Sequence, residues 1–359
     1  MPVPLSVLDL VPIGSGGSAA RSLRNSVDLA QRAERLGYVR YWFAEHHGLP
    51  GIASSSPEIL IEHIASATSR IRVGSGGIML PNHAPLRIAE AFHTLETLHP
   101  GRIDFGVGRA PGTDPVTSRA MHPFDAEKFP QQLQEVLGLS GSALPPDHPF
   151  HRVRVVPSGV TFPPVWILGS SGASARFAGS LGVGYAFARH FSPAPPEPAV
   201  HAYLESFRPS RMFPEPHVML GVSVICADTA ERAEQLALST DLVWVRYQRG
   251  EFGLLPSPDE AAAYNWSEYE RMIARAGRSR HFIGTPEMVM AQIDDLVRTT
   301  SASEVIVTTM IHDHRERVRS YELLATSTPQ PAVGGPRSDL AGSTALLLRE
   351  LKADPNGSS

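Results

Sequence analysis

The sequence predicts an α/β fold, a (β/α)8 TIM barrel with insertions in its βα loops. Eight short, β-rich segments alternate with helical patterns along the chain. Several of these segments are nearly continuous apolar runs, which is typical of parallel strands buried on both faces. The 359 residues of the chain exceed the roughly 250 that such a barrel needs, which leaves room for insertions. A doubly wound sheet is the alternative that this alternation allows.

The expected elements follow one another in a regular order. The strands are residues 5–10, 40–44, 71–78, 103–107, 165–168, 185–188, 219–226 and 305–309. Helical periodicity is clearest in residues 23–37, which end in a glycine, and in residues 56–69 and 285–299. The last two begin with Ser-Pro-Glu and Thr-Pro-Glu, which provide a capping hydroxyl, a proline and an acidic side chain for the first turn.

Some segments fall outside this alternation. Insertions are expected at residues 113–159 and 193–217, which are rich in proline and histidine, and at residues 246–267. We expect residues 1–327 to form the barrel domain. Residues 328–359 are expected to form a linker and a short amphipathic helix.

Composition excludes several classes of protein. With 42% hydrophobic residues the chain can form a large core, and its formal net charge of -4 gives no indication of a nucleic-acid or anionic-membrane partner. A single cysteine, Cys226, fits a reducing compartment. The N-terminus lacks the basic start of a signal peptide, and the apolar stretches are too short to span a bilayer. We therefore expect a soluble cytoplasmic protein.

Polar side chains recur where the expected strands end, which is where a barrel carries its chemistry. The second strand ends in Glu45-His46-His47, and the sixth and eighth are followed by further histidines. Three interpretations compete: a metal site, an acid/base site, or ordinary polar residues at a strand end. Neighbouring strand residues point in different directions, and the sequence has no HExxH motif. This favours acid/base chemistry, and we expect no metal.

The fifth strand leads into the segment "LGSSGASARFAGSLG", which predicts a strand, a turn of small residues and a helix. The first amides of a helix lack internal partners and attract anions, and Ser170, Ser171 and Ser174 add hydroxyl donors. Arg109 follows the neighbouring strand and could bind the same anion through two hydrogen bonds. The alternatives are an ordinary serine cap and a salt bridge of Arg109 at the barrel rim.

Glycines interrupt the third strand at Gly76-Gly77, in the segment "VGSGGIMLP". Glycine within a strand often marks a bulge or the close approach of a ligand, and a flat ring system against bare backbone would explain both residues. A bulge needed only to close the barrel would explain them equally well. A second glycine-rich segment, residues 13–18, lacks the dinucleotide-binding spacing and is expected to be a mobile βα loop.

The segments "YWFAEHHGLPGIASSSP" and "SGGIMLPNHAPL" resemble the bacterial luciferase-like, flavin-dependent monooxygenases, and the resemblance covers roughly residues 3–325. It implies a (β/α)8 barrel that uses reduced FMN and O2. His46 matches the family's catalytic histidine, with Glu45 as an orienting or structural carboxylate. Arg109 and the three serines at 170, 171 and 174 match phosphate-binding positions. Gly76-Gly77 matches a place where the family can have a non-prolyl cis peptide beneath the flavin.

The resemblance also implies a mechanism. Reduced FMN would come from a separate reductase, because no nicotinamide domain is visible, and O2 would add at the flavin C4a atom to give a (hydro)peroxide. His46 would serve as acid, base or hydrogen-bond partner while a small organic substrate receives one oxygen atom. The composition, rich in proline, arginine and alanine, is typical of high-GC genomes and suggests specialised metabolism such as antibiotic biosynthesis. The family commonly pairs its barrels, so we expect a homodimer that uses residues 56–69 and 85–98.

Three alternatives stay open. Deazaflavin (F420)-dependent oxidoreductases share the barrel and transfer hydride without oxygen. A flavin-binding protein without catalysis would keep the phosphate site, although His46 argues against it. A metal hydrolase would use the strand-end histidines as ligands.

Overall fold

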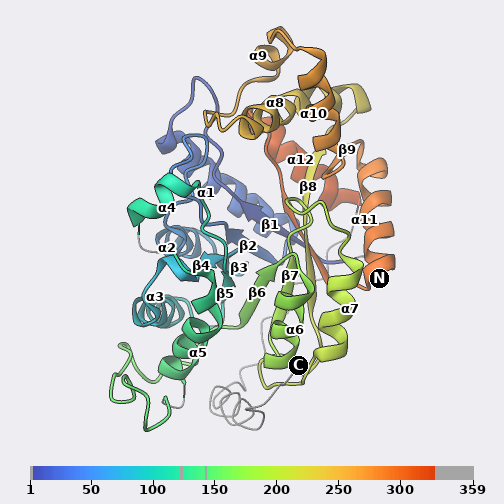
Figure 1. The fold of residues 1–359 in the computed structure, drawn as a ribbon. Helices are drawn as coiled ribbons and strands as arrows, with labels where there is room; N and C mark the ends of the chain where they lie inside the picture. The colour runs from blue at the N-terminus through green and yellow to red at the C-terminus, as the bar shows by residue number, and fades with distance from the viewer. Residues whose placement is uncertain (1–2, 122–123, 142–143, 328–359) are drawn as a thin grey trace.

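The computed structural model describes residues 3–121, 124–141 and 144–327. The expected C-terminal linker and short helix lie outside the described residues. Eight parallel strands close into a barrel at the centre of the molecule (Figure 1). They are β1 (Leu5–Asp9), β2 (Arg40–Phe43), β3 (Arg72–Ser75), β5 (Ile103–Gly108), β6 (Val165–Gly169), β7 (Gly184–Phe187), β8 (Val218–Cys226) and β10 (Glu304–Thr308). Because β10 pairs with both β8 and β1, the barrel is closed, which confirms the predicted fold and excludes the doubly wound sheet.

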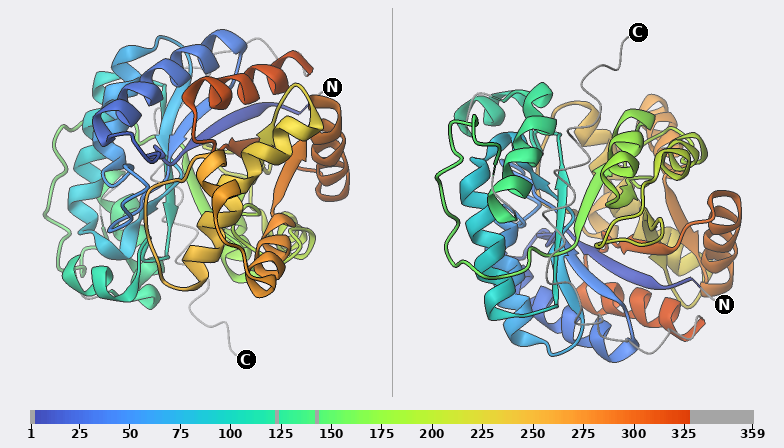
Figure 2. Two further views of the ribbon diagram at one scale, coloured as in Figure 1. Left: turned by 90° about the horizontal axis from the view of Figure 1, so that it is seen from above. Right: turned by 90° about the horizontal axis from the view of Figure 1, so that it is seen from below.

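Helices surround the strands on all sides, as the views along the barrel show (Figure 2). They are α1 (Ala19–Leu36), α2 (Pro57–Ala67), α3 (Pro85–Leu98), α5 (Phe129–Ser140), α6 (Gly172–Leu181), α7 (Glu197–Ser206), α11 (Pro286–Thr300) and α12 (His314–Ser327). Local sequence explains several of their ends. Thr285 caps α11 by accepting a hydrogen bond from the Met288 amide, and Gly37 ends α1 with φ of 86°. No helix of the described part of the chain is long and apolar enough to cross a membrane.

The third predicted strand, residues 71–78, is interrupted. It consists of β3 and the short β4 (Ile78–Met79), and the Gly76-Gly77 peptide between them is cis, as the resemblance implies. The Gly76 amide still donates to the Phe43 carbonyl at 2.7 Å, whereas Ile78 pairs with Val107 of β5. The chain therefore stops pairing with β2 at the glycines, and β4 then pairs with β5.

The insertions differ in part from those expected. The segments 113–159 and 193–217 contain the barrel helices α5 and α7, together with α4 (Pro115–Met121) and the short η2 (Ala126–Lys128) in the first segment. Their proline-rich sequences conceal short helices that pack on α3 and α6. The expected insertion at 246–267 is only the middle of a longer one, which comprises α8 (Ala230–Gln248), α9 (Pro258–Ala263), α10 (Glu268–Arg278) and β9 (His281–Gly284).

The strand β9 was not predicted, because its four residues are too short and too exposed on alternate positions to resemble a buried barrel strand. It pairs with the second half of β8, beyond the point where β8 pairs with β10. The first half of the nine-residue β8 thus pairs within the barrel, and its second half pairs with β9 of the insertion. This arrangement holds α8, α9 and α10 above one end of the barrel (Figure 1).

The barrel interior is closed at the end where the strands begin. Arg40 forms ion pairs with Asp104 at 2.8 Å and with Glu304 at 3.0 Å, and Arg72 pairs with Asp104 at 2.6 Å. Above this charged layer lies a buried apolar layer of Leu8, Trp42, Ala44, Trp166, Ala186, Met219 and Ile306. The opposite end, where the strands finish, is the end at which this fold usually carries its site.

Candidate active site

His46 lies three residues beyond the end of β2, in the loop at the carboxyl ends of the strands. Arg40 and Trp42 point into the interior, and Ala44 joins the same apolar layer. Beyond the strand, the His46 ring contacts the Gly112 carbonyl, whereas the His47 ring contacts Glu45. The predicted divergence of these three neighbours is thus confirmed by their contacts.

The hydrogen bonds of His46 fix its tautomer. Its backbone amide donates to the Ser54 carbonyl at 3.1 Å, and its Nδ1 lies 3.2 Å from the Gly112 carbonyl oxygen. A carbonyl can only accept, so we assign the ring proton to Nδ1, which leaves the lone pair of Nε2 free. Burial lowers the pKa of His46 and outweighs the Gly112 hydrogen bond and the Glu45 charge, which raise it. His46 is therefore a neutral acceptor at neutral pH.

Glu45 forms its side-chain hydrogen bonds with residues other than His46. It is fully buried, and its Oε1 accepts hydrogen bonds from His47 at 2.8 Å and His83 at 2.9 Å, while Oε2 accepts from the Met79 amide at 2.9 Å. Burial raises the pKa of this carboxyl, but the hydrogen bonds from both histidines and the amide outweigh it and bring the pKa to about 2. Glu45 thus ties the loop after β2 to β4. His83, in "PNHAP", was not among the predicted site residues, since only the fold brings it to Glu45.

Both glycines of the cis peptide are needed by the barrel wall itself. A Cβ atom at Gly76 would lie 2.7 Å from Leu8 Cδ1, and one at Gly77 would lie 2.8 Å from the Gly106 backbone. The rigid backbone excludes a side chain at Gly77, whereas one at Gly76 would require the Leu8 side chain to shift, in agreement with the structural interpretation. Their placement beneath a flavin stays a prediction.

At the end of β6 the structure has the predicted strand, turn and helix. Ser171 caps α6: its Oγ accepts from the Ser174 amide at 3.4 Å, and Ser174 Oγ donates to the Ser171 carbonyl at 2.9 Å. These two hydroxyls have local partners, as an ordinary cap requires, whereas Ser170 is exposed. The helix has ten residues, so its N-terminus carries a substantial partial positive charge.

One arginine follows the strand beside β6, and another lies at this helix terminus. Arg109 directly follows β5, the neighbour of β6, and it is exposed without an ion pair or hydrogen bond to any described residue. The rim salt bridge considered for it is thus not formed with the described part of the chain. Arg176, which the sequence did not single out, is exposed, and its guanidinium lies over Gly172 in the first turn. Its position five residues after the cap could have been noticed in the sequence.

The remaining strand-end histidines do not converge on one point. His312 Nε2 contacts the Ser15 carbonyl at 3.0 Å, and His314 pairs with Asp28 at 2.9 Å, so both support α1 and the loop before it. His190, after β7, lies against Gly221 of β8, and burial lowers the pKa of His190 to about 4. Among the described residues, no three His, Cys, Asp or Glu side chains form a group suited to a metal.

The loops above the mouth are joined to one another. The Ile13 amide donates to the Gly51 carbonyl at 2.9 Å. The Ser15 amide donates to the Leu255 carbonyl at 2.8 Å, and the Leu255 amide donates to the Ile13 carbonyl at 2.9 Å. Residues 13–18, expected to be a mobile loop, are thus anchored to the loop after β2 and to the long insertion. The glycine spacing did not predict this anchoring, because the residues that bind the loop are distant from it in sequence.

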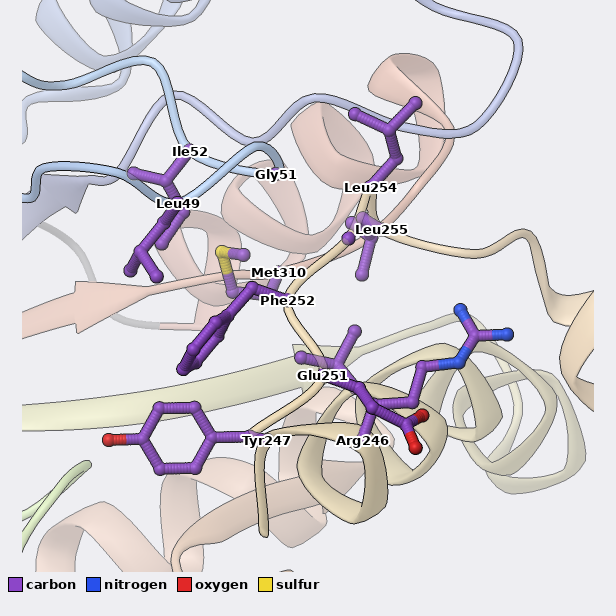
Figure 3. Close-up of a pocket in the computed structure, with 12 residues that line it drawn as sticks. Leu49, Gly51, Ile52, Arg246, Tyr247, Glu251, Phe252, Leu254, Leu255 and Met310 are labelled. Atoms are coloured by element: carbon purple, nitrogen blue, oxygen red, sulfur yellow. The ribbon is translucent and has the colours of Figure 1, made fainter. Parts of the chain in front are cut away.

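Between these loops lies a cleft of about 530 Å³, counted with its open side (Figure 3). Its lining is mostly apolar and includes Leu49, Ile52, Tyr247, Phe252, Leu254 and Met310. Three of these large side chains are unusually exposed: Tyr247 is 43% exposed, Phe252 39% and Leu254 38%. Arg246 and Glu251 are the charged residues of the lining. The cleft begins three residues after His46 and suits an apolar molecule.

The fold and this mouth define a barrel with a histidine-based site at the carboxyl ends of its strands. The family model for luciferase-like monooxygenases matches residues 3–303, and the chain belongs to this family of enzymes. Bacillus subtilis (strain 168) YvbT is 49% identical over 323 residues, 89% of this chain and 95% of that protein. A luciferase-like monooxygenase of Escherichia coli (strain K12) is 41% identical over 324 residues, 89% and 96% of the two chains. The crystal structure of apo-MsnO8 superposes with a TM-score of 0.80 and 36% identity, covering 91% of this chain and 97% of that one.

Barrels of this fold hold different cofactors. The oxygenating constituent of 3,6-diketocamphane monooxygenase, solved in complex with FMN, has a TM-score of 0.63 at 18% identity and covers 92% of this chain and 99% of its own. An F420-dependent secondary alcohol dehydrogenase, solved with an F420-acetone adduct, has a TM-score of 0.65 at 13% identity, with 93% and 100% covered. At these identities the likeness shows the fold alone.

Proposed function

We propose that this protein is a flavin-dependent monooxygenase that receives reduced FMN from a separate reductase and uses O2 to oxygenate a small, mostly apolar organic molecule. The observation that carries the proposal is His46, a neutral imidazole with a free Nε2 at the mouth of a barrel. The N-terminus of α6, which follows β6 at the same end of the barrel, would bind an anion. Bound reduced FMN would supply the electrons that activate O2.

Residues at the ends of β5 and β6 would hold the FMN phosphate. The donor set would consist of the exposed Ser170 hydroxyl, the first amides of α6 and the Arg109 guanidinium, which has no ion pair with the described residues. Such a set suits a dianion. Arg176 offers a second cation at the same helix terminus. The flavin ring would lie toward Gly76 and Gly77, where the wall has no side chain.

His46 would take up or share a proton at the reacting oxygen through Nε2, since Nδ1 is occupied by the Gly112 carbonyl. Glu45 would act as a positioning residue, because it holds the loop that carries His46 through His47 and His83. The joined loops above the mouth would exclude water from this step.

The organic substrate would enter the apolar cleft lined by Tyr247, Phe252 and Leu254. These exposed side chains lose unfavourable contact with water when a molecule covers them. The cleft adjoins the loop after β2, which also carries His46.

A reductase-coupled assay tests this function. Purified protein, FMN, a flavin reductase and NADH are incubated under 18O2 with a panel of apolar organic compounds, and products are analysed by mass spectrometry. Incorporation of one 18O atom into a product is expected, with no product when the reductase is omitted. Tight binding of F420 in preference to FMN, together with oxygen-independent reduction of a substrate, would instead establish the deazaflavin alternative.

We further propose that the protein is a cytoplasmic homodimer that pairs through α2 and α3. Ile59 on α2 is 67% exposed and Leu98 at the end of α3 is 56% exposed, as expected for side chains that a partner covers. Light scattering at micromolar concentration should give twice the chain mass of 38.8 kDa. A monomeric mass, or a dimer unchanged by Ile59→Asp, would exclude this interface.

A further inference from the structure

The side of the cleft that comes from the insertion is supported by a stack of aromatic rings. The ring of Trp244 on α8 lies nearly parallel to that of Tyr247, with centroids 5.6 Å apart and 15° between the planes. The Arg280 guanidinium lies over the Trp244 ring, 3.5 Å from its centroid. A Cβ atom at Gly277 of α10 would lie 2.6 Å from Trp244 Cδ1, so the glycine leaves room for this ring. Trp244 is thus fixed by its neighbours, and it fixes in turn the plane of the Tyr247 ring.

The end of α8 brings a second ring against Tyr247. Gly250 has φ of 72°, and its amide donates to the Tyr247 carbonyl at 3.0 Å. The Glu251 amide donates to the Arg246 carbonyl at 2.9 Å. These two hydrogen bonds form a Schellman motif, which ends the helix and redirects the chain. Phe252 therefore lies beside Tyr247, with ring centroids 5.8 Å apart and 72° between the planes (Figure 3).

Tyr247 and Phe252 together form an aromatic corner of the cleft. Tyr247 lines the cleft whereas Trp244 does not, so the stack presents its Tyr247 end to a ligand. A flat ring in this corner can stack on one of the two rings and meet the other edge-to-face. These are the two arrangements that aromatic pairs prefer. A saturated ring with the same carbon skeleton is puckered and has no π-system, so it gains neither contact.

The rest of the lining suits the same kind of molecule. Leu49, Ile52 and Met310 supply apolar surface, and the Met310 thioether can contact the edge of an aromatic ring. The two charged residues of the lining, Arg246 and Glu251, have opposite signs. They therefore give the cleft no net charge that would favour an ionic ligand.

We infer that the aromatic corner selects flat, aromatic or conjugated substrates, with Tyr247 and Phe252 in contact with the ring and Trp244 as a positioning residue behind Tyr247. This inference rests on the proposed function, because it names the substrate class of the same cleft. It goes beyond apolar binding in general. A saturated ring exposes at least as much apolar surface, so the hydrophobic effect alone would bind it at least as tightly.

Matched ligands test this selection without turnover. The alcohols 2-naphthol and decahydro-2-naphthol share a carbon skeleton and a hydroxyl group, and only the first is flat. Isothermal titration calorimetry of the full chain, without and with FMN, should give a Kd about three- to tenfold lower for 2-naphthol. Equal binding, tighter binding of the saturated alcohol, or binding of neither compound would overturn the inference. A preference found only with FMN would come from the flavin and would overturn it as well.

Two pairs of variants identify the residues responsible. Tyr247→Phe keeps the ring and should keep the preference, whereas Tyr247→Leu keeps only apolar surface and should bring the two Kd values within about twofold. Both should unfold in urea like the wild type, because the side chain is largely exposed. Trp244→Phe should keep most of the preference and Trp244→Leu should lose much of it, although Trp244 does not line the cleft. An unchanged preference in Tyr247→Leu would overturn the inference, and one in Trp244→Leu would exclude the positioning role.

The oxygenation assay separates this inference from the proposed function. Among the compounds that receive 18O, those with a flat ring system should have the lowest KM. Tyr247→Leu should raise that KM about three- to tenfold with little change in kcat. A saturated compound with the lowest KM would overturn the inference and leave the monooxygenase function in place. A protein that forms no oxygenated product refutes the proposed function, and calorimetry then decides separately whether the cleft selects flat rings.

Discussion

Replacement of His46 by alanine should abolish most oxygenation while leaving the fold and flavin binding intact. The side chain makes one hydrogen bond, 3.2 Å long, to the Gly112 carbonyl. Its loss should cost about 0.5–1.5 kcal/mol of the free energy of unfolding. The proposed phosphate site at Ser170 and Arg109 is formed by other strands, so the Kd for FMN should change by less than about threefold.

The catalytic loss should be far larger than the structural one. A positioned acid or base contributes roughly 100- to 10,000-fold to a step, so product formation should fall by at least about 100-fold, with the reduced flavin diverted to H2O2. The assay is the reductase-coupled reaction, in which oxygenated product, H2O2 and FMN binding are measured for each variant. Since the pKa of His46 is lowered, the wild-type rate should hold through neutral pH and decline only below about 6.5.

Two control variants separate chemistry from position. His46→Asn retains an N–H that can reach Gly112 but has no equivalent of Nε2, so it should be as inactive as His46→Ala and more stable. His47→Ala removes a neighbour that points to Glu45 and should affect product formation much less. Wild-type product formation by either His46 variant would refute the acid/base role and leave His46 as a structural strand-end residue.

The remaining predictions concern the cofactor, pH and substrate. Arg109→Ala should weaken FMN binding by about 1.5–3 kcal/mol in fluorescence titrations, the range for a hydrogen bond to a charged group, and an unchanged Kd would contradict the phosphate site. Glu45 has a folded-state pKa of about 2 against the usual 4.5, so its stabilisation, at most about 3 kcal/mol, is complete above pH 4.5 and lost as the pH falls toward 2. Urea unfolding should therefore show a deficit for Glu45→Gln at pH 7 that shrinks by pH 3. Phe252→Ala should raise the KM for an apolar substrate roughly tenfold with little change in kcat, and an unchanged KM would exclude the cleft as the substrate site.

Much of the barrel could be predicted because its strands are locally encoded. The buried β-rich runs and the capping sequences identified the barrel strands and helices α1, α2 and α11 to within a few residues. The period of two along β2 likewise separated His46 from Glu45 and His47. These signals depend on neighbouring residues, so they can be read without knowledge of the tertiary structure.

Other features depend on contacts between distant segments. The strand β9 exists because β8 extends beyond β10, and His83 joins the site only because β4 lies beside the loop after β2. The cleft is lined by residues near 50 and by residues near 250, which are distant in sequence. The inserted helix α8 has the length and the Thr229 cap of an ordinary barrel helix. No local pattern distinguishes such an inserted helix from the barrel helix α11 that follows.

The charged side chains of the barrel interior and the neutral His46 lie at opposite ends of the barrel axis. At the closed end, burial lowers the pKa of Arg40, but the adjacent Asp104 and Glu304 outweigh this and raise it, so all three stay charged. Together with Arg72 they form two cations and two anions, which balance one another within hydrogen-bond distance. The apolar layer lies between this cluster and the histidines.

Because its charges balance, this cluster exerts little net electric field on His46 beyond the apolar layer. The neutrality of His46 therefore follows mainly from its own burial, which is the largest influence on its pKa. An unpaired carboxylate beside it would instead raise the pKa and protonate Nε2, the nitrogen that the proposed reaction needs free. Glu45 is held on its far side by hydrogen bonds from His47 and His83. Its charge raises the pKa of His46, but the burial of His46 outweighs this effect.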